Sequence, residues 1–198
     1  MRATGRHLAR FILVALYTGT RASLVCGAAI RETLGKGYVD LSTGLFYRQP
    51  PGSKATKKRA PPIPLPSRLV AHMKRWESKG ISRNFVVEWN GKPVKRIKKS
   101  FNTARIIAGL GDDVTPHVLR HTAATWLMQK GVDLWEAAGY LGMSVETLER
   151  TYGHHHPRYL ANARDAIARQ NTDSYSRTED ERSFSSAAKK YKLSMKLR

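Results

Sequence analysis

The sequence predicts an α+β fold that is mostly helical, with a small antiparallel β-sheet at one side. Apolar residues recur at helical spacing in several stretches, which indicates amphipathic helices that each bury one face. Two short strand-like runs flank residues 42–44, Ser-Thr-Gly, a pattern that is typical of a β-hairpin. With 198 residues, of which 41% are hydrophobic, the chain can bury a substantial core.

The first half of the chain begins with a predicted helix and continues into the predicted sheet. The helix covers about residues 6–16 and ends at a turn over 17–20. No small-residue cleavage site follows, so we interpret this basic and apolar start as a core helix and not as a secretion signal. Strands are predicted at 38–41 and 45–48. A basic, proline-flanked loop then leads to an edge strand at 63–65, a position that prolines tolerate.

Two further helices and a short strand are predicted before residue 110. We expect Ser67 to cap a helix that Gly80 ends, and residues 85–89 to form a strand. Apolar residues at helical spacing over 97–108 indicate another amphipathic helix. Its other side would lie against backbone phosphates if it met DNA, and otherwise it is a solvated face. The basic residues on this side are Lys95, Arg96, Lys98, Lys99 and Arg105.

The stretch 115–152 predicts three packed helices in succession. Thr115 precedes a proline, a typical helix start, and Lys130-Gly131 is a typical helix end. Asp133 and Ser144 are expected to cap the second and third helices, and Gly153 to stop the third.

Three side chains in this stretch carry the chemistry. His117 and Arg120 lie three residues apart and therefore project from the same helical face. Tyr152 lies near the end of the third helix. The packed helices are thus expected to hold an imidazole, a guanidinium and a phenol in fixed relation.

Charge and cysteine content narrow the class of partner. Lys plus Arg minus Asp plus Glu is 35 − 15 = +20, which indicates a polyanionic partner, with nucleic acid ahead of a membrane surface. No apolar run is long enough to cross a membrane. The single Cys26 permits no internal disulfide, which fits the cytoplasm. Residues 170–198 turn polar and basic, so we expect a disordered tail.

These motifs resemble the tyrosine recombinase, or phage integrase, family. HVLR at 117–120 matches its His-x-x-Arg signature, and LGM at 141–143 stands where the family reads Leu-Gly-His. Tyr152 follows nine residues after Met143, as the family spaces it, and YTGTR, which ends at Arg21, is similar to its first arginine box. The resemblance covers about residues 6–168 and implies a catalytic domain over 1–169, with the tail at 170–198.

The resemblance implies DNA strand exchange through a covalent 3′-phosphotyrosine. Arg21 and Arg120 would neutralise the phosphate, His117 would assist proton transfer, and Tyr152 would be the nucleophile. A lysine on the hairpin turn, Lys58 or its neighbour Lys57, would protonate the departing oxygen. The reaction needs no ATP, metal or other cofactor, and family members work as tetramers on paired sites. The residues expected to contact DNA are Lys57, Arg59, Lys98 and Lys99.

The chain departs from the family pattern at two positions. Met143 stands where the family has His or Trp, and a thioether cannot donate a hydrogen bond to phosphate. This predicts slower chemistry or a replacement donor, for which His154 and His155 are candidates. Leu24 stands where an acidic residue is usual, so support of Arg21 by a carboxylate is in question.

Two other classes of protein compete with the recombinase interpretation. His117 and His121 are four apart, as in a zinc site, but the glutamate that the zincin pattern requires is replaced by Val118. The stronger rival is a truncated integrase remnant that only binds DNA. Integrases usually carry another DNA-binding domain ahead of the first arginine box, and we expect that domain to be absent here, either because the chain is a fragment of a longer integrase or because it is a truncated element.

Overall fold

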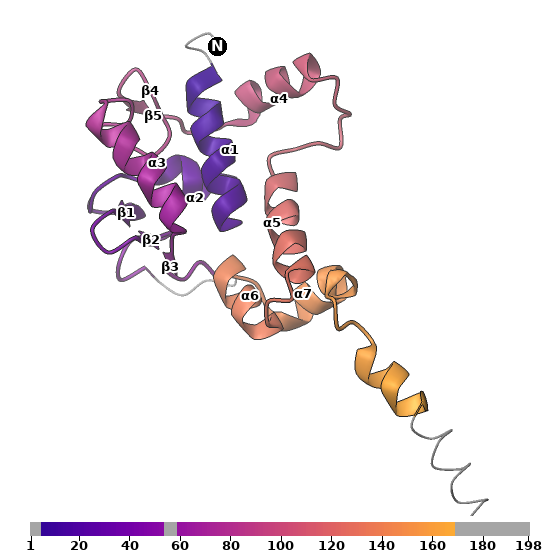
Figure 1. Cartoon of the computed structure of the whole chain (residues 1–198). Coiled ribbons are helices and arrows are strands. Elements are labelled where there is room, and N and C mark those ends of the chain that lie inside the picture. Colours follow the sequence, from indigo (N-terminus) through magenta and orange to yellow (C-terminus); the bar gives the residue numbers. More distant parts are fainter. Residues whose placement is uncertain (1–4, 54–58, 169–198) are drawn as a thin grey trace, which may run out of the picture. The chain divides into compact units, whose positions relative to one another are not determined.

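The computed structural model describes residues 5–53 and 59–168. The chain divides into two compact units, Met1–Pro157 and Arg158–Arg198, and each is described by itself. In the first unit, α1 (Arg6–Thr18) lies between α3 (Ser67–Ser78) and α5 (Val118–Gln129), as Figure 1 shows. This first unit confirms the mostly helical α+β class with small antiparallel sheets.

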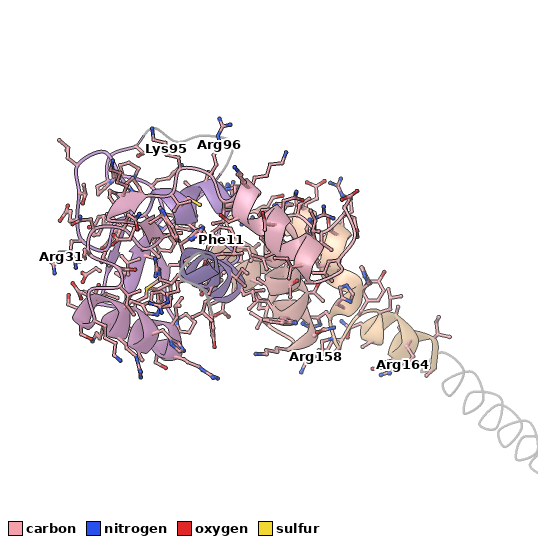
Figure 2. All side chains as sticks on the ribbon, turned by 90° about the horizontal axis from the view of Figure 1, so that it is seen from above. Phe11, Arg31, Lys95, Arg96, Arg158 and Arg164 are labelled. Atoms are coloured by element: carbon pink, nitrogen blue, oxygen red, sulfur yellow. The ribbon has the colours of Figure 1, made fainter. Side chains whose placement is uncertain are left out.

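Helix α1 is the centre of the first unit. It carries fully buried Phe11 and Val14 on one face, and Gly19 ends it with a positive φ of 58°. Phe11 lies among the surrounding helices in Figure 2, whereas Arg31, Lys95 and Arg96 project outward. The predicted core helix at the start of the chain is therefore confirmed.

A three-stranded antiparallel sheet packs beside α3. Its strands are β1 (Tyr38–Asp40), β2 (Leu45–Tyr47) and β3 (Ile63–Pro64), in that order. Phe46 in the central strand pairs with Val39 on one side and with Ile63 on the other, and all three side chains are buried. The predicted hairpin and its edge strand are confirmed.

Two short helices and a second ribbon complete this part of the fold. Helix α2 covers Ala22–Gly27, and α4 covers Lys98–Ile107. Strands β4 (Glu88–Trp89) and β5 (Lys92–Pro93) form an antiparallel ribbon around Asn90-Gly91. The helical spacing offered Ile107 or Ala108 as the last inward residue of α4, but Ile107 is 81% exposed and Ala108 is exposed as well.

The C-terminal half of the first unit consists of three helices and a single 3-10 turn. After α5 come α6 (Leu134–Leu141), α7 (Val145–Tyr152) and the turn η2 (Gly153–His155). Asp133 accepts hydrogen bonds from two backbone N–H groups and caps α6, and Ser144 accepts one and caps α7, as expected.

Two predicted helix starts were wrong by one or two residues. Helix α5 begins after His117, which occupies the cap position, while Thr115 contributes only its carbonyl, to the N–H of Val118. Pro66 occupies the cap position of α3, and Ser67 is its first residue without a side-chain cap. In both cases a neighbouring proline fixes the entry of the chain.

The first unit contains two hydrophobic clusters. The larger one joins α1, the sheet and α3 through residues such as Phe11, Phe46 and Leu69. The smaller one joins α5, α6 and α7, and includes Leu148 and Tyr152. Because Tyr152 is itself a buried member of the second cluster, packing of α5, α6 and α7 fixes where it lies.

The second unit is described only in part. Residues 161–168 form a helix, on which Arg164 pairs with Asp165 at 2.8 Å. The predicted tail at 170–198 lies outside the described residues. Across the ranges that are described, no helix combines the length and apolar character that a bilayer crossing requires.

Candidate active site

Arg21 is the first residue of the site along the chain. It occupies the cap position of α2, just after the Gly19 turn, and its side chain is half-buried. Its Nη1 donates to the carbonyl of Arg59 at 2.9 Å, and its Nη2 donates to the carbonyl of Gly142 at 3.5 Å. The described contacts of the Arg21 guanidinium are therefore backbone carbonyls, and Leu24 offers it no carboxylate.

Arg120 is the second guanidinium of the site and is only 6% exposed. Its Nη1 donates to the carbonyl of Gly19 at 2.7 Å and to that of Leu141 at 2.6 Å. Burial, followed by the nearby Arg21 charge, lowers the pKa of Arg120 to about 10, so the side chain stays protonated at neutral pH. The two arginines lie within electrostatic reach of each other.

Tyr152 lies on the inner face of α7 and is 7% exposed. Its hydroxyl forms a short hydrogen bond with Nδ1 of His121, an exposed residue on α5. Burial raises the pKa of Tyr152, while the charge of Arg120 opposes that rise. The phenol is therefore neutral at neutral pH, close to Arg120, and in contact with a potential proton acceptor.

His117 lies beside these groups at the start of α5. Its ring meets the ring of His121 edge-on, with centroids 4.6 Å apart. Burial, followed by the charges of His121, Arg120 and Arg21, lowers the pKa of His117. The structure thus brings together four of the residues that the sequence singled out: Arg21, His117, Arg120 and Tyr152.

Met143 follows the turn at the end of α6. It is partly buried against the smaller hydrophobic cluster and lines a groove of about 900 Å³ together with Trp135 and Tyr140. The ring centroids of His154 and His155 lie 4.0 Å apart. That His154 or His155 supplies the hydrogen-bond donor that Met143 lacks stays a prediction.

The predicted DNA-contacting residues fall into three groups. Lys98 and Lys99 are exposed on the first turn of α4, and Arg59 is exposed beside the Arg21 contact. Arg105, in contrast, is bound to Asp112 at 2.6 Å and folded against the protein. Lys57 and Lys58 lie outside the described residues.

Two further residues lie beside these four, although their sequence positions did not point to this site. His121 was considered only as a metal ligand, although it lies one helical turn from His117 and on the same face. Arg48 is 2% exposed, and both Arg120 and Arg21 act on its charge. The burial of Arg48 could have been inferred from strand alternation, because residues 46 and 48 share a face of the strand and Phe46 is buried.

The described part of the chain contains no cluster of side chains that could bind a metal ion. Within residues 5–53 and 59–168, no group of at least three His, Cys, Asp or Glu side chains could hold an ion. The pair formed by His117 and His121 is instead completed by a tyrosine hydroxyl.

Comparison with known sequences gives one family and several relatives. Residues 2–158 match the model of the phage integrase family. Tyrosine recombinase XerA of Thermococcus kodakarensis is 31% identical over 150 residues, which are 72% of this chain and 49% of that protein. Tyrosine recombinase XerD of Corynebacterium glutamicum is 30% identical over 155 residues, which are 72% of this chain and 47% of that protein. The chain spans about half the length of these relatives.

Solved structures share the fold at low sequence identity. The Tn1549 transposon integrase in complex with circular intermediate DNA gives a TM-score of 0.63 at 18% identity, over 84% of this chain and 61% of that one. The XerH site-specific recombinase bound to difH substrate gives 0.56 at 22%, over 82% of this chain and 48% of that one. The catalytic domain of bacteriophage HP1 integrase gives 0.50 at 21%, over 83% of this chain and 90% of that one.

Proposed function

This chain belongs to the phage integrase family, and from that premise we propose that it breaks and rejoins DNA as a tyrosine-type site-specific recombinase. The observation that carries the proposal is the meeting of two arginines, from distant segments, next to a buried tyrosine hydroxyl. The charge of +20 supports a polyanionic substrate. The Tn1549 integrase and XerH, which share the fold, were solved bound to DNA.

The first step of the proposed reaction is attack of Tyr152 on a DNA phosphate. The phenol oxygen forms a bond to phosphorus, the bond to the 5′ oxygen breaks, and a 3′-phosphotyrosine results. Arg21 and Arg120 neutralise the nonbridging oxygens and stabilise the charge that develops there. Both guanidinium groups are held by carbonyls rather than carboxylates, so their charge remains available to the phosphate.

Proton transfer accompanies the attack. Because burial keeps the phenol neutral, the hydroxyl needs an acceptor, and we assign this role to Nδ1 of His121, which it already contacts. His117 assists as the adjoining imidazole. Lys58, with Lys57 as the alternative, protonates the departing 5′ oxygen. In the second step, a 5′ hydroxyl freed on another strand attacks the phosphotyrosine. The bond between phosphorus and the Tyr152 oxygen breaks and the phenol takes back a proton, so the exchange needs no ATP, metal or other cofactor.

The remaining residues tune this reaction or bind the duplex. Met143 cannot donate to the phosphate, which removes a hydrogen bond to a charged group that is worth about 1.5–3 kcal/mol, or roughly ten- to a hundredfold in rate. Arg59, Lys98 and Lys99 are exposed and contact backbone phosphates. The protein acts in the cytoplasm, and it assembles as a tetramer on paired sites.

A covalent capture experiment tests the proposal and finds the target site in the same step. Randomly nicked host DNA is incubated with the protein, and adducts that survive denaturation are recovered and sequenced. Wild type is expected to yield an enriched sequence, Tyr152→Phe none, and Tyr159→Phe, which alters an exposed tyrosine, the wild-type result. If no protein forms an adduct although all bind DNA, the chain is a binding remnant and the enzymatic proposal is wrong.

A further inference from the structure

Three consecutive carbonyls at the end of α6 each accept a hydrogen bond from a different arginine. Tyr140 accepts from Nη1 of Arg48 at 3.0 Å, Leu141 from Nη1 of Arg120 at 2.6 Å, and Gly142 from Nη2 of Arg21 at 3.5 Å. We call these three carbonyls the carbonyl row. The C-terminal end of a helix carries partial negative charge, so it stabilises cations without neutralising them.

Arg48 is the arginine of this set that lies deepest. It follows β2, and its Nε donates to the carbonyl of Pro61 at 2.7 Å, while Nη1 reaches Tyr140. One planar side chain therefore ties the segment that leads into β3 to the end of α6. Its Nη2 is buried without a hydrogen-bond partner in the described ranges, and it lies 3.3 Å from the position that a Cβ on Gly142 would take.

The charge of Arg48 is not offset by a carboxylate in the described part of the chain. The ion pairs found there involve Arg31, Arg105 and Arg164, at other places. Burial, followed by the charges of Arg120 and Arg21, lowers the pKa of Arg48 to about 10, so it stays protonated at neutral pH. Buried charges are normally paired, and an uncompensated cation next to two others indicates a site whose partner is an anion.

We propose that Arg48 is a positioning residue of the phosphate pocket, which fixes the carbonyl row that holds Arg120 and Arg21 and adds its own positive charge behind them. This inference rests on the proposed function, because it takes the anion to be a phosphodiester oxygen. The guanidinium nitrogens of Arg48 are occupied or buried, so it acts through the other two arginines and through its field rather than by touching the DNA.

The test follows arginine Nε–H resonances by NMR in protein labelled with ¹⁵N-arginine, titrated with inorganic phosphate at constant ionic strength. In the wild type, the signals of Arg21, Arg48 and Arg120 should shift with one common dissociation constant. Arg31, which is exposed and paired with Glu77, is the internal control and should not follow that curve. If Arg48 stays still while Arg120 shifts, the proposal is overturned, and this readout requires no variant to fold.

Two variants separate charge from mechanical support. Arg48→Gln should weaken phosphate binding at Arg120 about tenfold, the effect of one unit charge at a partly buried site. Arg48→Lys keeps the charge but cannot reach both carbonyls, and it should restore binding to within about threefold of wild type. Equal weakening by both variants would show that the charge of Arg48 contributes nothing, and no weakening by Arg48→Gln would show that neither role exists; either result overturns the proposal that Arg48 acts in both ways. If no arginine responds to phosphate in the wild type, the pocket itself fails, and the role of Arg48 with it.

Discussion

Replacing Gly142 by alanine should damage the protein far more than the same change three residues earlier. Gly142 has a φ of +67°, in the left-handed region, where a side chain costs about 1–2 kcal/mol. An added Cβ would also lie 2.7 Å from the carbonyl oxygen of Arg59, a contact that the backbone must move to relieve. Together these effects predict a loss of about 2–4 kcal/mol in the free energy of unfolding.

Gly139 provides the matched control within the same helix. An alanine Cβ there would meet nothing within 4 Å, and the position is exposed inside α6. Gly139→Ala should therefore stabilise the protein by about 0.5–1 kcal/mol through reduced freedom of the unfolded chain. The two alanine variants thus differ in sign.

Urea denaturation, followed by circular dichroism, measures both changes. A third variant, Gly142→Asn, divides the cost, since asparagine tolerates positive φ better but still carries a Cβ against Arg59. It should fall between wild type and Gly142→Ala. If Gly142→Ala is as stable as wild type, the tight turn does not hold the carbonyl row as described, and the reasoning is refuted.

Three further changes test other parts of the structure. His121→Phe removes the acceptor next to the phenol and should slow adduct formation at least about a hundredfold, while phosphate binding, measured by NMR, stays unchanged. An unaltered rate of adduct formation would show that another group accepts the proton. Burial, followed by the charge of Arg10, lowers the pKa of His7, so the unfolded chain takes up the proton more readily. The stability of the wild type is therefore complete above the ordinary histidine pKa of about 6.5 and should decline as the pH falls below it, with a smaller decline in His7→Gln. Equal declines by denaturation would exclude His7 as a cause. Leu148→Ala leaves a cavity at a fully buried position and should lower the free energy of unfolding by about 2–5 kcal/mol in denaturation experiments. Leu34→Ala, at an exposed site, should change it by less than about 0.5 kcal/mol. A loss in Leu148→Ala no larger than that in Leu34→Ala would contradict the packing described for α7.

Local chemistry made much of the fold predictable. Asp133 and Ser144 cap their helices because each side chain satisfies N–H groups within its own first turn, a short-range effect that the sequence shows directly. The hairpin around Gly44 follows from the same kind of local preference. Thr115 failed as a cap because the proline after it starts a turn and leaves the cap position to His117.

The site was predictable only where its residues fall into ordered motifs. Arg21, Arg120 and Tyr152 could be chosen from the resemblance of their motifs to the recombinase family, but the partners that hold the two arginines could not, because these are backbone carbonyls without a sequence signature. For the same reason, the place of Arg48 in the site could not be predicted: its two carbonyl acceptors lie 13 and 92 residues away in the sequence. His121 was weighed only as a metal ligand, because its contact with Tyr152 depends on how α5 and α7 pack.

The links that hold the arginines span nearly the whole first unit. Arg120 reaches back 101 residues to Gly19, and Arg21 reaches forward 121 residues to Gly142. A nascent chain that still lacks α6 has neither the acceptor at Leu141 nor the one at Gly142, so its guanidinium groups have no fixed arrangement. Under the proposed function, the arrangement of the two guanidinium groups would therefore be completed only after α6 has been synthesised and packed.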